Sequence, residues 1–322
     1  MRIGTRASAL ALAQAGTVAA LLGEDAQLVP VTTSGDRASR GGAAADAPPG
    51  ARDTPAGERD TPAGARDTPA EAQDKERWVK ELEVALLEGE IDLAVHSAKD
   101  VPSELPEGLQ LAGAPRRGDP FDALVGAASL ARLPAGARVG TSSLRRAAQL
   151  RAVREDLLVV AIHGNVDSRL RRLAAGELDA LVLAAAGLIR LDRGAEIGAM
   201  LGEFVPAAGQ GTLALEARAG DERAHAGARA ITDPATWDAL CAERALVAAL
   251  GASCNTPLGA HATIDKQGVT LRTFVGLPDG SAWLRDEGPA AVSPDQAAEV
   301  AARRLLSAGG DELLRRAEEL AA

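Results

Sequence analysis

Four short segments of this 322-residue chain place polar side chains directly after an apolar stretch. They are Arg2–Ser8, His96–Pro102, Gly140–Arg146 and His163–Arg169. In each, the apolar stretch is typical of a buried strand, and the residues that follow begin a helix or a turn. Because ligands of open α/β sheets bind at the carboxyl ends of the strands, we expect the four segments to surround one site.

The segment Gly140–Arg146 has the composition of an anion site. Three hydroxyl residues and two arginines follow the glycine, at the beginning of a predicted helix: Thr141, Ser142, Ser143, Arg145 and Arg146. Free backbone N–H groups at a helix N-terminus, hydroxyl groups and guanidinium groups all bind negatively charged oxygen atoms. A capped helix with solvated arginines is the alternative for any one segment, but four such segments in one chain favour a binding site.

The segment His96–Pro102 offers acid–base chemistry. Lys99 and Asp100 stand side by side after the strand predicted over 91–96, and the Val101–Pro102 pair that follows disfavours a helix. A carboxylate held at such a strand end can stabilise a nearby cation or relay a proton. We therefore take Asp100 as the candidate acid–base group.

Composition and charge limit the partners. The net charge of −10 argues against binding to nucleic acid or to acidic membranes, so an anionic ligand needs arginines that are concentrated locally. The longest apolar run, Leu181–Ile189, is too short to span a membrane. Two cysteines are too few for a disulfide framework, which favours the reducing cytoplasm. A signal peptide over Ala7–Leu22 is the alternative, but Gln14 interrupts it and Ser8 suits the N-cap of a helix there.

Alternating strands and helices must position these segments. Strands are predicted over 27–32, 91–96, 109–112, 138–140, 157–162 and 180–183, and helices over 8–22, 77–88, 144–153 and 167–175. This order predicts parallel-type α/β sheets. After about residue 231 the pattern changes to a helix over 235–250, strands over 260–264, 269–276 and 281–286, and helices over 294–308 and 311–321. That second pattern predicts a separate α+β domain.

Residues 41–74 differ in composition from the rest of the chain. They repeat the sequence Arg-Asp-Thr-Pro-Ala and contain little that could be buried in a core. Burial therefore cannot offset the entropy lost on ordering, and we predict a disordered surface loop.

Taken together, the four polar segments resemble the hydroxymethylbilane synthase (porphobilinogen deaminase) family. Further matching segments are spaced along the chain in the family's order: Val79–Glu83, Ala184–Arg190, Pro206–Gly211, Ala242–Ala245 and the cysteine segment Gly251–Gly259. The resemblance covers nearly the whole chain, and as a set these segments are highly specific.

The resemblance implies an α/β fold of two lobes with mixed sheets, similar to type II periplasmic binding proteins, and a C-terminal α+β domain. The first lobe is expected to comprise residues 1–115 and 212–230, with the lid or insert at about 41–74. The second lobe is expected at 116–211, and the cofactor-anchoring domain at 231–322.

The implied reaction joins four porphobilinogen molecules, with loss of ammonia, on a dipyrromethane cofactor bound covalently to Cys254. Hydrolysis then releases linear hydroxymethylbilane for tetrapyrrole (porphyrin and heme) biosynthesis. By resemblance, Asp100 is catalytic, and the cofactor is bound by Cys254, Lys99, Asp100, Thr141, Ser142, Ser143, Arg145 and Arg146. Substrate is bound by Arg6, Ser8, His163, Arg169, Arg190 and Gln210. The enzyme is expected to be a cytoplasmic monomer without a metal ion, and neither nucleic acid nor membrane is expected as a partner.

The four histidines have different expected roles. His163 stands where the family usually has an arginine, so this contact with substrate is expected to be weaker or pH-dependent. We expect His96 to support the site or to pack in the core, and His225 and His261 to lie on the surface or in loops.

Two alternative functions remain open: a two-lobed anion-binding protein without catalysis, and a weakly active, degenerate synthase. Asp100 beside Lys99, and Cys254 in a domain of its own, argue against a simple binder.

Overall fold

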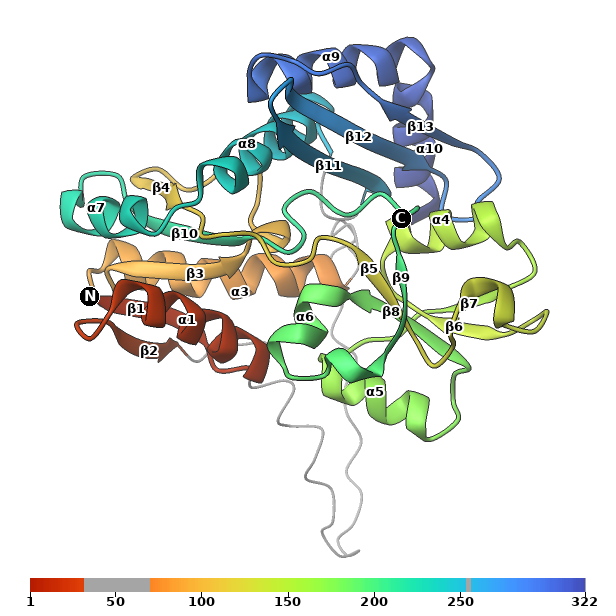
Figure 1. The fold of residues 1–322 in the computed structure, drawn as a ribbon, viewed down its shortest axis with the longest axis horizontal. Helices are drawn as coiled ribbons and strands as arrows, with labels where there is room; N and C mark the ends of the chain where they lie inside the picture. The colour runs from red at the N-terminus through yellow and green to blue at the C-terminus, as the bar shows by residue number, and fades with distance from the viewer. Residues whose placement is uncertain (32–69, 253–255, 322) are drawn as a thin grey trace, which may run out of the picture.

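The computed structural model describes residues 1–31, 70–252 and 256–321. Cys254 and most of the predicted insert lie outside these ranges. Within them the strands form two five-stranded mixed sheets and one three-stranded antiparallel sheet, each with helices packed on it (Figure 1). The predicted class, two α/β lobes with mixed sheets followed by an α+β domain, is confirmed.

The first sheet has the order β2-β1-β3-β10-β4. Its strands are β1 (Arg2–Arg6), β2 (Gln27–Val31), β3 (Leu93–Ser97), β4 (Leu109–Gly113) and β10 (Leu213–Arg218). Helices α1 (Ala9–Leu22) and α7 (Glu222–Ala230) share one apolar cluster with the sheet, and α3 (Ala70–Leu87) shares a second one. Ser8 caps α1 as predicted, because its hydroxyl accepts a hydrogen bond from the Ala11 N–H.

Helix α3 begins earlier than the sequence suggested. Its first residues, from Ala70, fall inside the insert predicted over 41–74. Alanine, glutamate, glutamine and lysine in this stretch are good helix formers, so the helix extends back from its buried C-terminal half. The repeat itself lies outside the described residues.

The second sheet has the order β7-β6-β8-β5-β9. Its strands are β5 (Asp122–Val125), β6 (Arg138–Gly140), β7 (Leu158–Val160), β8 (Ala180–Ala184) and β9 (Ile197–Leu201). Helix α4 (Leu144–Val153) packs into one apolar cluster of the sheet, and α5 (Val166–Ala174) and α6 (Ala185–Arg190) pack into the other. Short 3₁₀ turns lie at Leu130–Arg132 and Gly194–Glu196.

Two crossing segments join these lobes, one between β4 and β5 and one between β9 and β10. They are hydrogen-bonded to each other, since the Gly118 N–H donates to the Gly211 carbonyl over 3.1 Å. The strands that follow the crossings run antiparallel to their neighbours: β5 pairs with β8 and β9, and β10 pairs with β3 and β4. The parallel sheets predicted from alternation alone therefore become mixed sheets.

The third sheet comprises β11 (Leu258–Asp265), β12 (Gly268–Gly276) and β13 (Trp283–Glu287). Helices α8 (Pro234–Ala249), α9 (Pro294–Ser307) and α10 (Gly310–Ala321) pack against it, as predicted for the C-terminal region. We propose that each sheet is the centre of one domain, with the boundaries expected from the sequence. In the described ranges, no helix is both long and apolar enough to cross a membrane.

Candidate active site

Asp100 lies in a 3₁₀ turn, Ala98–Asp100, directly after β3. We call residues Ser97–Val101 the Asp100 turn. The Val101 N–H donates to the Ala98 carbonyl over 3.2 Å, and the Ala98 N–H donates to the Thr212 carbonyl over 3.0 Å. The turn is thus tied to the crossing segment before β10, and it leaves the Asp100 side chain half-buried at the carboxyl end of the strand.

A small pocket opens beside Asp100. It is formed by β1, α1, α3 and β3 and is lined by Arg6, Ala11, Gln14, Val79, Leu82, Val95, His96, Ser97 and Asp100. Arg6, from the end of β1, and Asp100, from the end of β3, therefore share one pocket, as expected for neighbouring parallel strands. The Gln14 amide donates to the Ser97 hydroxyl over 2.8 Å and fixes the pocket wall between them.

The wall of this pocket contains a buried contact between a histidine and a carboxylate that the sequence did not predict. The Nε2 atom of His96 is 2.9 Å from Oε2 of Glu216 on β10, and both side chains are nearly inaccessible to water. His96 is therefore buried and also lines the pocket, and its support of the site stays a prediction. Burial raises the pKa of nearby Glu83 on α3, and the negative charge of Glu216 raises it further. Three titratable side chains, those of His96, Glu216 and Glu83, therefore lie in or near the wall of this pocket.

Arg145 and Arg146 enclose a second missed carboxylate, Asp122 at the beginning of β5. Arg145 donates to Asp122 over 2.7 and 3.1 Å, and Arg146 Nε donates over 2.8 Å. Burial by itself would raise the pKa of Asp122, but the two guanidinium groups outweigh it and hold the pKa well below its usual range. The same arginines also donate to the carbonyls of Val205 and Val182. Both arginines therefore have internal partners, and their binding to cofactor stays a prediction.

Arg146 also connects the two lobes electrostatically. Burial lowers the pKa of its guanidinium, whereas the negative charges of Asp122 and Asp100 raise it. Asp100 belongs to the first lobe and Arg146 to the second, so the charge of Asp100 acts on Arg146 across the boundary between the lobes. That all four segments surround one site stays a prediction.

The three hydroxyl residues shape the turn between β6 and α4. The Thr141 hydroxyl accepts a hydrogen bond from the Ser143 N–H, and the Ser143 hydroxyl caps α4. The Ser142 hydroxyl donates to the Ile162 carbonyl over 2.6 Å and accepts from the Ile162 N–H over 3.0 Å. These bonds fix the turn beside the segment that leads to His163.

The remaining predicted substrate residues lie in and near the second lobe. His163 is exposed in the loop between β7 and α5, and Arg169 Nε donates to the Gly164 carbonyl at the base of that loop. Arg190, half-buried at the end of α6, donates to the Gly211 carbonyl over 2.7 Å. Gln210 is buried and donates to Asp122 over 2.9 Å, so it belongs to the Asp122 network. Their contacts with substrate stay predictions.

A buried carboxylate, Glu243 on α8, joins the third domain to both crossing segments. Its Oε1 accepts from Arg117 over 2.7 Å and from the Ala262 N–H over 2.8 Å, and its Oε2 accepts from the Gly209 N–H over 2.6 Å. Arg117 also donates to the Gln210 carbonyl. The sequence pointed to Glu243 only through the segment Ala242–Ala245 and assigned it no role.

Two histidines are not where the sequence placed them. His225 in α7 and His261 in β11 were expected on the surface or in loops, but both are buried. The ring of His261 lies 5.6 Å from that of Phe121, between the third sheet and a crossing segment. Burial, followed by the charges of Arg117 and Arg272, lowers the pKa of His261 to about 4. The expectation was wrong because these residues face neighbouring elements rather than water.

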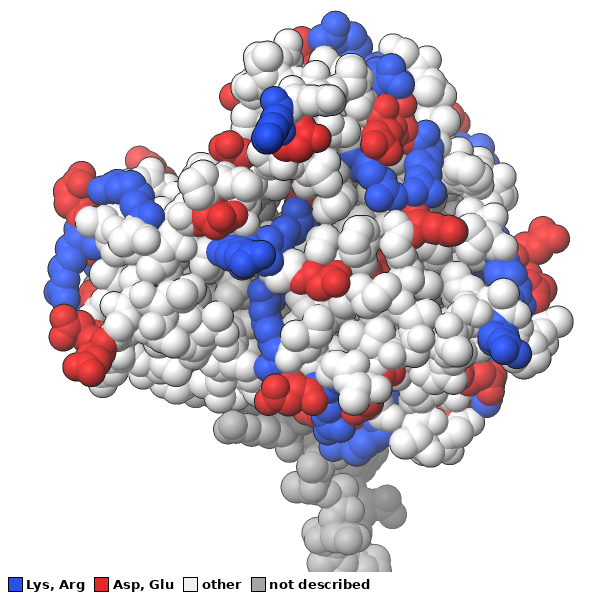
Figure 2. Space-filling model, viewed as in Figure 1, with Lys and Arg blue, Asp and Glu red and all other residues white. Residues whose placement is uncertain are grey.

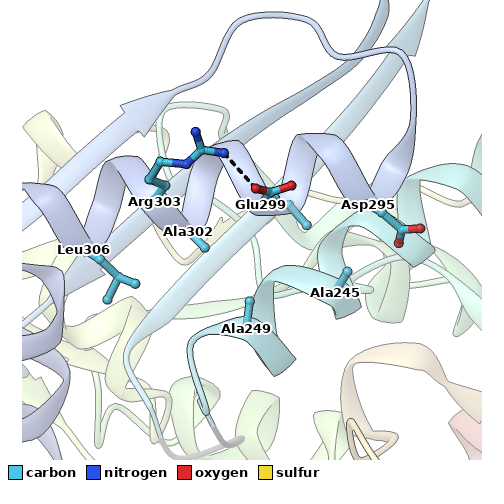
Figure 3. A pocket seen from close by; sticks show the side chains of 8 residues that line it. Ala245, Ala249, Asp295, Glu299, Ala302, Arg303 and Leu306 are labelled. Atoms are coloured by element: carbon cyan, nitrogen blue, oxygen red, sulfur yellow. Dashed lines mark hydrogen bonds and ion pairs between the residues drawn. The ribbon is translucent and has the colours of Figure 1, made fainter.

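A second hollow lies between α8 and α9, away from the predicted site residues (Figure 3). Its walls are mainly alanine methyl groups, and Arg303 forms a 2.9 Å ion pair with Glu299 at its rim. The lining residues are Ala245, Ala249, Asp295, Ala298, Glu299, Ala302, Arg303 and Leu306. Because this lining contains none of the predicted site residues that the structure describes, we place the candidate site at Asp100.

Basic side chains concentrate where the lobes meet. Figure 2 shows Lys and Arg side chains following one another down the middle of the displayed face, along the boundary between the lobe at left and the rest of the molecule. In a chain with a net charge of −10, such a local concentration of basic side chains is what the binding of an anionic ligand requires.

The chain matches two family models. The model described as "Porphobilinogen deaminase, dipyromethane cofactor binding domain" matches residues 1–44 and 63–226, and that described as "Porphobilinogen deaminase, C-terminal domain" matches 237–304. Among curated proteins, the chain is 43% identical to a porphobilinogen deaminase of Deinococcus radiodurans over 98% of both chains. It is 48% identical to one of Thermus thermophilus over 74% of this chain and 81% of the relative.

The solved structures to which the chain is similar are more distant. A periplasmic substrate-binding protein of an ABC transporter from Coxiella burnetii is 13% identical, with a TM-score of 0.41, over 74% of this chain and 94% of that one. A nutrient-binding protein from Burkholderia cenocepacia bound to methionine is also 13% identical, with a TM-score of 0.40, over 73% and 92% of the two chains.

Proposed function

Because this chain belongs to the porphobilinogen deaminase (hydroxymethylbilane synthase) family, we propose how its residues divide the reaction among them. The chain has the porphobilinogen deaminase function in tetrapyrrole biosynthesis and contains the dipyrromethane cofactor-binding domain. The proposal concerns the roles of the individual side chains. In it, four porphobilinogen molecules are joined with loss of ammonia, and linear hydroxymethylbilane is released by hydrolysis.

The described residues have suitable chemistry for the cofactor. Dipyrromethane carries acetate and propionate groups, and it supplies the pyrrole end to which substrate units are added. Guanidinium, ammonium and hydroxyl groups bind such carboxylates. They come from both lobes, with Lys99 in the Asp100 turn and Ser143 and Arg146 at the beginning of α4. We assign covalent attachment to Cys254, because a cysteine thiolate is the nucleophile that the segment Gly251–Gly259 offers.

Asp100 is the proposed catalytic carboxylate. Loss of ammonia leaves positive charge on the pyrrole, and a carboxylate held beside the pyrrole N–H stabilises that charge. The same carboxylate can hold a proton for the departing amine. The observation that carries this role is the position of Asp100, half-buried at the end of β3 in one pocket with Arg6 and within electrostatic reach of Arg146.

Arginines around the lobe boundary are proposed to bind the carboxylates of substrate and product. Arg6 lines the Asp100 pocket, and the Arg190 guanidinium is oriented by its bond to the Gly211 carbonyl. Ser8, Arg169 and Gln210 complete the proposed set. His163 is proposed as a weaker donor, because an imidazole has fewer N–H groups than the planar fork of a guanidinium.

Two variants test the assignment of the cofactor cysteine. Purified wild-type protein should exceed its sequence mass by that of a bound dipyrromethane. Cys254→Ser should lose both this extra mass and activity, because a serine hydroxyl is not ionised near neutral pH. Cys241→Ser, in the middle of α8, is the matched control and should keep both. A Cys254→Ser protein that still carries two pyrrole units would contradict the assignment.

The Asp100→Asn variant tests the catalytic carboxylate. It preserves the shape of the side chain but removes its negative charge. We expect kcat to fall about 100-fold or more, as on removal of one electrostatic stabiliser, with the cofactor still bound. A kcat near that of wild type would exclude Asp100 as the catalytic carboxylate.

A cytoplasmic monomer completes the proposal. It rests on the small number of cysteines and on the family resemblance. Size-exclusion chromatography with light scattering should give the mass of one chain, and a stable dimer would contradict it.

A further inference from the structure

Arg244 on α8 binds the backbone that directly follows Asp100. Its guanidinium donates to three successive carbonyls: over 3.2 Å to Val101, 2.7 Å to Pro102 and 2.9 Å to Ser103. The contacts join the third domain to the first lobe across some 140 residues of sequence. A guanidinium is always charged and has five N–H donors in a fixed plane, so it can hold several carbonyls in one arrangement.

The same side of α8 packs against the Asp100 turn through apolar contacts. Trp237 and Leu240 share a core cluster with Ala98 and Val101, the residues on either side of Lys99 and Asp100. Positions 237, 240 and 244 lie on one face of a helix, because their spacings of three and four residues match the helical repeat. Figure 1 shows α8 running from the first lobe to the third sheet, so one rigid element spans both.

The crossing segment holds the turn from another side. Gly209 has a φ of +72°, and a Cβ atom there would lie 2.9 Å from the backbone of Ala98 and Lys99. Only glycine tolerates both this conformation and this approach. The Asp100 turn is therefore packed between α8 and the crossing segment at Gly209. Arg244 binds the irregular segment through which the chain leaves this turn, at Val101, Pro102 and Ser103.

We propose that Arg244 is a positioning residue for the reaction, which fixes the Asp100 carboxylate by holding the three carbonyls that follow it. The inference rests on the proposed catalytic role of Asp100. Without Arg244, three carbonyl groups lose a charged donor, and water must replace it in a half-buried place. The turn then shifts relative to the second lobe. A misplacement of about 1 Å costs up to about 100-fold in rate.

The first test compares Arg244→Ala, Arg244→Gln and Arg244→Lys as purified holoenzymes, with cofactor content checked by intact mass. For the Ala and Gln variants we expect kcat to fall about 10- to 100-fold while KM for porphobilinogen changes little, because the three carbonyls that Arg244 binds belong to none of the proposed substrate residues. Lysine keeps the charge and should restore part of kcat. If Arg244→Ala does not fold, Arg244→Gln decides in the same way. The matched control is Arg303→Ala, which removes an exposed ion pair on α9 and should behave as wild type.

The second test combines Arg244→Gln with Asp100→Asn. If Arg244 acts through Asp100, the double variant should be no slower than Asp100→Asn itself. A further full loss in the double variant would overturn the inference, as would a wild-type kcat for Arg244→Gln. Failure of the proposed function looks different, because Asp100→Asn would then itself retain wild-type kcat. That outcome would also remove the basis for the role of Arg244.

Discussion

Glu243→Gln should destabilise the protein more than any exposed substitution. The Glu243 carboxylate is fully buried and accepts hydrogen bonds from Arg117, the Gly209 N–H and the Ala262 N–H. A glutamine has one oxygen and one NH₂ group in place of two oxygens. One of these donors then faces another donor, and the Arg117 guanidinium loses its charged partner while it remains only 11% exposed.

The expected size of the effect follows from these contacts. Removal of one partner from a buried ion pair costs about 3 to 5 kcal/mol, because the other charge stays buried without compensation. For a chain of this length, such a loss corresponds to a fall in melting temperature of roughly 4 to 7 °C. Glu243 and its three donors join the third domain to both crossing segments. We therefore expect the unfolding transition of the whole protein to shift to lower temperature, rather than one part to unfold separately.

Thermal and urea unfolding, followed by circular dichroism, measure this loss. Glu299→Gln is the matched control, because its exposed pair with Arg303 on α9 contributes about 0.5 kcal/mol or less. Arg117→Gln should cost as much as Glu243→Gln, and the double variant should cost less than the sum of the two. If Glu243→Gln lost no more stability than Glu299→Gln, the contacts of Glu243 would contribute nothing to the free energy of unfolding, and the reasoning would be refuted.

Two further predictions concern histidines. The pKa of His261 is lowered to about 4 in the folded protein, while in the unfolded chain it is about 6.5. The unfolded state therefore binds the proton first as pH falls, and between pH 6.5 and 4 this one group should remove up to about 3 kcal/mol of stability. His261→Phe, which keeps a ring against Phe121, should lose less stability over this range than wild type, and parallel pH curves would contradict the prediction. His163→Arg should lower KM for porphobilinogen, because a guanidinium is always charged and can bind a carboxylate with two parallel N–H groups. An unchanged KM would remove His163 from the substrate site.

Local patterns in the sequence determined most helices and strands. Helices α1, α4, α5, α8 and α9 lie within a residue or two of their predicted bounds, because apolar spacing and caps such as Ser8 act over a few residues. The strand-end segments were recognisable for the same reason. Asp100 and the hydroxyls of Gly140–Arg146 do follow β3 and β6.

Strands β5 and β10 show what local patterns omit. They were not among the predicted strands, although they occupy the interior of their sheets and run antiparallel to their neighbours. Both are entered from the crossing segments, and their partners are far away in the chain. Such pairing leaves no short-range period in the sequence, so the mixed character of the sheets came only from the family resemblance.

The partners of the charged residues were decided by tertiary structure. The sequence determined that arginines would gather at the end of β6, but not that Arg145 and Arg146 would enclose Asp122. It contained Glu243 and Arg244 as neighbours on a helix, but not that one would bind the crossing segments and the other the Asp100 turn. The sequence specifies the sign of each charge and the length of the side chain that carries it. Which opposite charge or carbonyl it meets depends on the distance between elements after packing, because electrostatic and hydrogen-bond energies are set by a few ångströms.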